Sequence, residues 1–344
     1  MLPAVRFLCP ANSAAPWIIC ATANPFDLLQ TIADSGDHPA RLFAAGLQFA
    51  QRAKVLHYSD LPTFLATAKA VLAEGPIAVI MAEDGTEVDT TLRHHLVAGF
   101  KSVLLLAPDE IALAPQLAGQ IHRISHNVHA EAALPDAVNQ LMNAAAGSWL
   151  YCCYNAEYLF FPFCETRRIG EMLAFHSEER RDAVLSYVVD LYAADLTESP
   201  DAVSLENAHI DRSGYYALAR TTPAPPHSPK DRQLDFFGGL RWRFEEHIPW
   251  SRRRIDRIAL FRAKTGLRMR PDFTLSDEEM NTYACPWHNN ITTAICSFRT
   301  AKALRANPGS RFEINSFLWQ NSTGFQWQSQ QLLDLGLMEP GQWF

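Results

Sequence analysis

The residues best placed to do chemistry form a short polar step between two apolar runs. Residues 149–154 (WLYCCY) have the continuous apolar pattern of a buried strand, and the step 155–157 (NAE) follows directly. A carboxylate beside a buried strand must be paired, hydrogen-bonded or placed at the mouth of a cleft, because burying it alone is costly. Glu157 therefore either contacts a ligand, or caps the next turn or pairs with Arg167 or Arg168.

Two more acidic positions follow predicted strands. Glu83 comes after the apolar run 77–81, and Asp109 comes after the run 102–106. A helix is predicted between these strands, over residues 89–98, so the three elements form a parallel βαβ unit. Ligands bind beyond the carboxyl ends of the strands in such sheets. Glu83 and Asp109 are therefore candidates for ligand contacts, and the alternative is that they are ordinary turn residues.

These segments predict an α/β protein with a mixed, mainly parallel central sheet flanked by helices. Residues 1–75 are alanine-rich and are expected to form a helical N-terminal segment. The central domain is expected over residues 76–305, and residues 306–344 are expected to be an aromatic tail that packs on it. Helical spacing in the N-terminal segment is clearest over residues 26–33, 40–53 and 61–73.

Composition favours a soluble cytoplasmic protein. The chain has 344 residues, 48% of them apolar and 19% charged, as in globular proteins. No apolar run reaches the roughly 18 residues of a membrane helix, and no signal peptide is recognisable, so no membrane span is expected. The seven cysteines show no C-x-x-C spacing, which favours reduced thiols.

A basic run with interleaved aromatic residues extends from Arg241 to Arg270 and contains ten Lys or Arg residues. One interpretation is a solvated surface on which these charges pair with neighbouring carboxylates. The mixture of arginine and aromatic residues also resembles single-stranded nucleic-acid sites. The net charge of −7 and the lack of a known nucleic-acid motif argue against that second interpretation. No nucleic-acid partner is therefore expected.

Four short stretches occur in an order and spacing that match one family pattern. They are Met81–Asp84 followed by His94–Leu96 and Gly99-Phe100; Tyr154–Leu159; Phe237–Arg241; and His288 with Ile295–Arg299. Together they resemble a branch of the family 2 glycosyltransferases, which have the GT-A fold. In that branch the second stretch reads Asp-Ala-Asp-Glu-Phe-Leu and the third reads Phe-Gly-Gly-Pro-Arg. The resemblance covers roughly residues 76–305.

The resemblance implies transfer of a sugar from a nucleotide-sugar donor, of the UDP or GDP type, to a glycan or another acceptor. It places Glu83 and Asp109 near the nucleotide. It places Glu157, as a catalytic candidate, and Asn155 near the donor sugar. Gly239, in the turn before the basic run, would belong to the diphosphate site.

The acceptor hydroxyl would lose its proton to a carboxylate or an imidazole. The candidates are Asp277, Glu278 and His288, and the sequence does not choose among them. The alternative is that Asp277 and Glu278 begin a helix whose N-cap is Ser276. Negative charge is favoured in the first turn of a helix.

The chain departs from the family pattern where the metal would bind. The two aspartate positions are Tyr154 and Ala156, and the histidine of the last stretch is Ser297. Mn²⁺ and Mg²⁺ prefer carboxylate oxygens, which tyrosine and alanine do not supply. Glu157 and the carbonyl oxygen of Asn155 are the remaining ligands for either ion. No conventional metal site is therefore expected.

Without a metal, another cation must neutralise the charge that develops on the departing diphosphate. The planar fork of arginine suits phosphate, and Arg241 beside the turn Gly238-Gly239 is expected in that role. The leading hypothesis is thus a metal-independent glycosyltransferase. The alternative is a catalytically inactive glycosyltransferase-like protein that serves as a binding or partner protein, because a fold does not establish a function.

Overall fold

The structure is a computed structural model, and it describes residues 56–343. The helices predicted over residues 26–33 and 40–53 lie outside the described residues. The described residues belong to one compact unit, Arg52–Phe344. The helical spacing predicted over 61–73 is present as a helix followed by a 3₁₀ turn, α2 (Leu61–Thr67) and η1 (Lys69–Ala73).

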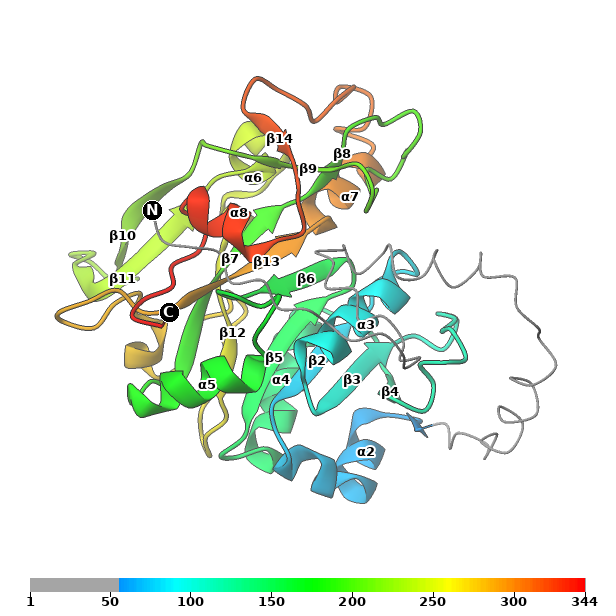
Figure 1. Cartoon of the computed structure of the whole chain (residues 1–344), viewed down its shortest axis with the longest axis vertical. Helices are drawn as coiled ribbons and strands as arrows, with labels where there is room; N and C mark the ends of the chain where they lie inside the picture. Colours follow the sequence, from blue (N-terminus) through cyan, green and yellow to red (C-terminus); the bar gives the residue numbers. More distant parts are fainter. Residues whose placement is uncertain (1–55, 344) are drawn as a thin grey trace, which may run out of the picture. The chain divides into compact units, whose positions relative to one another are not determined.

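A nine-stranded mixed sheet forms the centre of the unit (Figure 1). Five neighbouring strands are parallel to one another, and β12 (Asp256–Arg262) is antiparallel to both of its neighbours. The strands β7 (Ala183–Asp190) and β13 (Thr292–Ser297) are parallel, and β6 (Glu157–Phe160) closes the sheet in the antiparallel direction. The predicted mixed, mainly parallel sheet is confirmed. In spatial order the strands are β1 (His57–Tyr58), β4 (His122–Ser125), β3 (Ser102–Ala107), β2 (Ile77–Met81), β5 (Trp149–Tyr154), β12 (Asp256–Arg262), β7 (Ala183–Asp190), β13 (Thr292–Ser297) and β6 (Glu157–Phe160).

Helices cover both faces of this sheet. The helices α3 (Val88–Ala98) and α5 (Ile169–Glu178) lie on one face, and α4 (Ala133–Ala144) lies on the other (Figure 1). Every residue of β2 and β5 is buried, as expected for strands with both faces covered. Among the described residues, no helix is long and apolar enough to cross a membrane.

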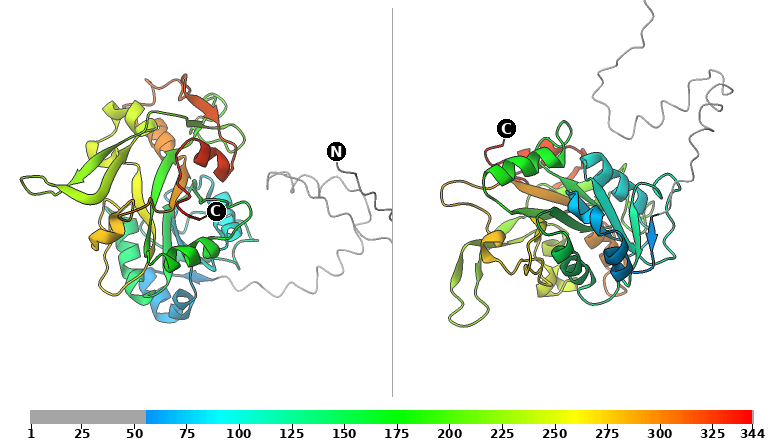
Figure 2. Two further views of the ribbon diagram at one scale, coloured as in Figure 1. Left: turned by 60° about the vertical axis from the view of Figure 1, so that its left-hand side comes forward. Right: turned by 90° about the horizontal axis from the view of Figure 1, so that it is seen from below.

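Two smaller sheets and the C-terminal elements adjoin the carboxyl ends of β7 and β13. One sheet is a hairpin of β10 (Tyr216–Thr221) and β11 (Pro229–Phe237), which projects from the rest of the unit (Figure 2). The other contains β8 (Tyr192–Ala193), β9 (Ala208–Asp211) and β14 (Ser322–Gly324). Three short helices complete this region: α6 (Leu240–Arg243), α7 (Arg299–Ala306) and α8 (Ser329–Asp334).

The last part of the chain packs on the central sheet. Phe325, Leu332 and Met338 share a hydrophobic cluster with side chains of β6 and β13. Trp343 joins the main core beside Phe163 and Phe175. These contacts bury apolar surface that the strands β6 and β13 would otherwise expose at the sheet edge.

Candidate functional site

The polar step predicted after β5 lies at the carboxyl ends of the parallel strands. Asn155 uses its whole side chain there: its Oδ1 accepts a hydrogen bond from the Glu83 backbone N–H at 3.0 Å, and its Nδ2 donates to Asp84 Oδ1 at 2.7 Å. The Nδ2 also donates to the Thr86 carbonyl oxygen at 2.8 Å. Asn155 therefore ties the end of β5 to the loop after β2, and its amide oxygen is already in use.

Glu157 is fully buried and satisfied by internal partners. It accepts hydrogen bonds from Arg257 Nη1 at 2.9 Å, from the Tyr154 backbone N–H at 2.9 Å and from Ser297 Oγ at 3.0 Å. Burial alone would raise the pKa of the Glu157 carboxyl, but the Arg257 charge and these hydrogen bonds outweigh it and lower the pKa. Glu157 is thus an ionised carboxylate, and its predicted partners Arg167 and Arg168 are replaced by Arg257.

A second arginine reaches the same place from the start of α7. Arg299 donates to both carboxylate oxygens of Glu83, each at 2.7 Å. Its guanidinium carbon lies 3.9 Å from the centroid of the Tyr154 ring, and that of Arg257 lies 5.6 Å from the same centroid. A third of the Arg299 side chain is exposed, whereas Arg257 is buried. Glu83, Tyr154, Glu157, Arg257 and Arg299 are called the arginine–tyrosine cluster below.

The cluster does not provide a metal site. Glu157 and Glu83 each bind a guanidinium, and a divalent cation beside them would meet the positive charges of Arg257 and Arg299. Tyr154 presents its ring to both arginines. Among residues 56–343, no group of three or more His, Cys, Asp and Glu side chains is arranged to hold a metal ion. The donor set therefore does not fit Mn²⁺ or Mg²⁺.

Arg241, predicted at the diphosphate, is buried among internal partners. Its Nη1 donates to the Arg254 carbonyl oxygen at 2.6 Å, its Nε donates to Thr300 Oγ1 at 3.1 Å, and its Nε lies 3.7 Å from Asp190 Oδ1. Burial raises the pKa of the Asp190 carboxyl, and the charge of Arg241 offsets only part of that rise. The guanidinium of Arg241 is committed to the protein interior.

Gly239 lies directly on Asp190. Its φ of 61° is in the left-handed region, and a Cβ at this position would approach Asp190 Oδ2 to 2.9 Å. The turn therefore needs glycine for both backbone conformation and space. This is a packing reason for Gly239, independent of any ligand.

Asp109 lies at the same edge of the sheet but on the outer strands. It follows β3, is exposed, and accepts a hydrogen bond from Ser125 Oγ at the end of β4. The Nε2 atom of His57 lies 3.5 Å from Asp109 Oδ1. The structure thus puts Asp109 in a small surface group with Ser125 and His57, and its contacts are separate from those of the arginine–tyrosine cluster.

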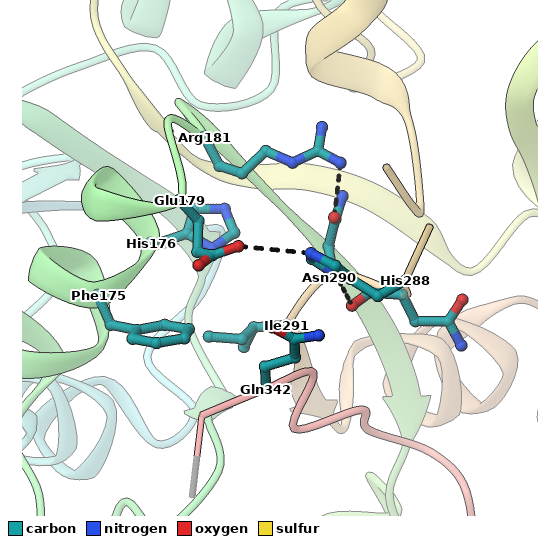
Figure 3. A pocket seen from close by; sticks show the side chains of 9 residues that line it. Phe175, His176, Glu179, Arg181, His288, Asn290, Ile291 and Gln342 are labelled. Atoms are coloured by element: carbon teal, nitrogen blue, oxygen red, sulfur yellow. Dashed lines mark hydrogen bonds and ion pairs between the residues drawn. The ribbon is translucent and has the colours of Figure 1, made fainter. Parts of the chain in front are cut away.

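His288 and Asp277 lie at the opposite, amino edge of the parallel strands. His288 precedes β13, and its Nε2 lies 3.4 Å from Glu179 Oε2 in a small pocket (Figure 3). The cavity volume is about 10 Å³, which is room for about one water molecule. The structure therefore does not bring His288 together with Glu157, whose hydrogen-bond partner Ser297 lies at the other end of β13.

Asp277 caps a turn at that same amino edge. Its Oδ1 accepts a hydrogen bond from the Glu279 backbone N–H at 3.2 Å, at the start of the 3₁₀ turn η4 (Glu278–Asn281). The N-cap is thus Asp277 rather than the predicted Ser276, whose Oγ accepts from the Arg268 backbone N–H at 3.0 Å. These contacts match the capping interpretation.

The basic run is largely neutralised within the protein. Of its ten Lys and Arg residues, all but Arg252 and Arg268 form ion pairs within the described part of the chain. Pairing with carboxylates, as one interpretation predicted, thus matches these contacts, but Arg241 and Arg257 pair in the interior and not on a solvated surface. Arg257, a member of this run, and Arg299, the last residue of the stretch 295–299, were not predicted as site residues. Both could have been proposed, since each is an arginine inside a stretch already singled out.

Comparisons with known proteins do not identify a family for this chain. No family model matches the chain, and no curated protein matches it. One similar solved structure is a UDP-glucose pyrophosphorylase from Acinetobacter baumanii, which is 10% identical with a TM-score of 0.32. The similarity covers 70% of this chain and 97% of that chain. At this level of similarity, neither fold nor function carries over from one chain to the other.

Proposed function

We propose that the protein is a metal-independent glycosyltransferase-like enzyme that binds the diphosphate of a nucleotide sugar at Arg299. The observation that carries the proposal is the arginine–tyrosine cluster. Two guanidinium groups lie beside Tyr154 at the carboxyl end of β5, where a metal-dependent relative would hold its cation. The strand order reverses between β2 and β5, since β3 lies on one side of β2 and β5 on the other, and ligands of α/β sheets bind beyond the carboxyl ends of the strands at such a switch point.

The exposure and geometry of Arg299 suit this role. Its two bonds to Glu83 have the bidentate geometry that arginine uses for carboxylates and phosphates alike. Two oxygens of a diphosphate can therefore replace those of Glu83. In the transfer, the acceptor oxygen forms a bond to the anomeric carbon and its proton passes to water, while the bond between the anomeric carbon and the diphosphate oxygen breaks and its electron pair leaves with the diphosphate. A guanidinium held in advance at that oxygen stabilises the charge that develops there.

A non-catalytic binding protein is the second candidate, and one observation favours it. Glu157 is buried under Arg257, so it is not available to contact the donor sugar or to take a proton. A protein with this site retains the means to bind a diphosphate and lacks a free carboxylate beside β5. Binding and turnover must therefore be measured separately.

Thermal unfolding with UDP, GDP and their common hexose derivatives tests binding. A ligand present at 100 times its Kd adds about 2.7 kcal/mol to the free energy of unfolding. We expect a shift of the melting temperature with one nucleotide, unchanged by EDTA or Mn²⁺. The variant Arg299→Gln should lose this shift, and Arg252→Gln, an exposed arginine of the basic run, should keep it. No shift with any of these nucleotides, or a shift only with Mn²⁺, contradicts the proposal.

Turnover separates the two candidates once a nucleotide is known to bind. An active transferase releases nucleoside diphosphate from the matching nucleotide sugar, slowly to water or faster to an acceptor. Release that Arg299→Gln abolishes supports the enzyme. Binding without any release, across a panel of acceptors, supports the binding protein.

A further inference from the structure

Three aromatic rings form a stack at the base of the β10–β11 hairpin. Tyr216 pairs with Phe237 across the hairpin, and their ring centroids are 5.2 Å apart with the planes 16° from parallel. Trp250, in the 3₁₀ turn η3 (Trp250–Arg252), lies on Phe237 at 5.3 Å and 25°. The middle ring is buried, whereas the outer residues Tyr216 and Trp250 are 41% and 62% exposed. Tyr216, Phe237 and Trp250 are called the aromatic stack below.

The aromatic stack lies on the same edge of the sheet as the arginine–tyrosine cluster. Phe237 forms a β-bridge with Arg254, and β12 begins two residues later, at Asp256. Arg257, the next residue, binds Glu157. The hairpin base and the cluster are thus joined through the first residues of one strand. A ligand on the stack is therefore at the same edge of the sheet as the proposed donor site.

The surroundings of the stack do not favour a polyanion. Arg253, whose guanidinium carbon lies 5.6 Å from the Trp250 ring centroid, is paired with Glu245 at 2.8 Å. Arg254 is paired with Asp256 at 2.7 Å and also with Asp235 and Asp272. Binding of nucleic acid depends on cations that are free to replace counterions at phosphates. Arg253 and Arg254 are thus neutralised, and of these neighbouring arginines only Arg252, two residues from Trp250, forms no ion pair within the described part of the chain. One unpaired arginine is few for a polyanion, so the stack suits an uncharged ligand better.

The exposed area is too small for a stable protein interface. Leu218, two residues from Tyr216 on the same face of β10, adds apolar surface and is 49% exposed. Aromatic side chains have about 150–250 Å² of surface, so these exposed groups present on the order of 300 Å². A stable interface buries about 800 Å² on each partner. The patch matches a small ligand better than a second protein.

We propose that the aromatic stack is an acceptor subsite for an uncharged glycan. This rests on the proposed function, in which a sugar is transferred to an acceptor. Aromatic rings carry negative charge on their faces, which attracts the partly positive C–H groups on the flat side of a sugar ring. The sugar hydroxyls can then remain in water, so no buried polar group is left without a partner. The exposed rings of Trp250 and Tyr216 provide the surface for one or two sugar residues.

The test is a fluorescence and calorimetric titration of the full chain with uncharged hexasaccharides of glucose in α-1,4, β-1,4 and β-1,3 linkage and of N-acetylglucosamine. We expect one of these glycans to bind. Trp250→Ala should weaken its affinity at least tenfold, and Trp250→Phe should restore part of it. The matched control is Trp287→Ala, because Trp287 is 83% exposed but precedes β13 at the amino edge of the sheet. That variant should bind as the unchanged protein does.

The outcomes distinguish failure of the acceptor subsite from failure of the proposed donor site. The nucleotide shift should be the same in all three tryptophan variants, so its loss or absence concerns the donor site alone. Failure of every glycan to bind overturns the acceptor subsite, as does binding that Trp250→Ala leaves intact. A dimer in sedimentation that Trp250→Ala dissociates, or salt-sensitive binding of poly(U) through Trp250, also overturns it in favour of another occupant.

Discussion

At the level of single residues, the Glu157–Arg257 ion pair explains why a carboxylate can be buried at the end of a central strand. Both side chains are buried, and the Coulomb attraction with three hydrogen bonds offsets the loss of hydration. Removing one charge leaves the other buried without a partner. Glu157→Gln should therefore lower the free energy of unfolding by about 3–5 kcal/mol in a urea titration.

Glu110→Gln is the matched control for this measurement. Glu110 follows β3 and is exposed, so its replacement should change the free energy of unfolding by less than about 0.5 kcal/mol. A loss at Glu157 no larger than that at Glu110 would show that the ion pair does not stabilise the protein.

Glu83 should weaken the binding of a nucleotide, because it occupies the guanidinium of Arg299. If Glu83 holds the guanidinium that a diphosphate binds, then Glu83→Gln removes a competing anion and leaves Arg299 with its positive charge. We expect the Kd of the bound nucleotide, measured by calorimetry, to fall by about tenfold or more, consistent with about 1.5 kcal/mol for a hydrogen bond to a charged group. A rise in Kd would instead indicate that Glu83 contacts the nucleotide directly, as the family resemblance predicts.

The sequence predicted the strand end that precedes residues 155–157, but it did not predict the contacts of these residues. The step 155–157 was placed at a strand end, and the need of Glu157 for a partner followed from burial costs. The partner itself, Arg257, is 100 residues away in the chain, and no local pattern connects the two. The sequence showed that Tyr154 and Ala156 replace the family aspartates, but it did not show that Arg257 and Arg299 lie beside Tyr154, because that depends on the fold.

At the level of elements, the turn Gly238-Gly239 joins the hairpin to α6 and depends on glycine. Gly238 has a φ of 154°, and a Cβ there would lie 2.2 Å from Tyr215 Cδ1 and 2.9 Å from the Gly214 carbonyl oxygen. Gly238→Ala should therefore destabilise the protein by about 1–3 kcal/mol and disturb the neighbouring aromatic stack. Thermal unfolding and the glycan titration together measure both effects.

Gly170→Ala is the control for that substitution. Gly170 is the second residue of α5, and a Cβ there would meet no atom within 4 Å. Because glycine is unfavourable in helices, this change should stabilise the protein by about 0.5–1 kcal/mol. Equal effects at the two glycines would show that the turn tolerates a side chain.

The elements that the sequence predicted best are the fully buried parallel strands. The apolar runs 77–81 and 149–154 have the same bounds as β2 and β5, because continuous burial on both faces leaves a continuous apolar pattern. In contrast, β12 lies inside the basic run and was not predicted. Its first two residues, Asp256 and Arg257, are charged and buried; Asp256 pairs with Arg220 as well as with nearby Arg254, and Arg257 pairs with distant Glu157. Periodicity cannot reveal a strand whose charges are paired elsewhere.

At the level of the whole molecule, buried histidines should make stability depend on pH. Burial lowers the pKa of His95 in α3 to about 3, and that of His176 in α5 to about 4. Both are neutral in the folded state near pH 6, whereas in the unfolded chain a histidine has a pKa of about 6.5. As the pH falls below 6.5, the unfolded state therefore takes up protons that the folded state does not, and the free energy of unfolding decreases.

Each of these two histidines should contribute a slope of about 1.2 kcal/mol per pH unit between pH 6 and 5. The carboxylates with lowered pKa, such as Glu157, lose their contribution only at lower pH, below the usual carboxylate range. Asp190, whose pKa is raised, acts in the opposite direction, since its folded state takes up a proton more readily as the pH falls. Comparing the unchanged protein with His176→Gln in urea titrations at pH 7, 6 and 5 therefore isolates the effect of this histidine. His176→Gln keeps a donor for the Ala183 carbonyl oxygen, which His176 Nε2 contacts at 2.8 Å, and should reduce the slope by about 1.2 kcal/mol per pH unit. An unchanged slope in this variant would mean that His176 is protonated in the folded core, and the charge would then need a partner that its contacts do not provide.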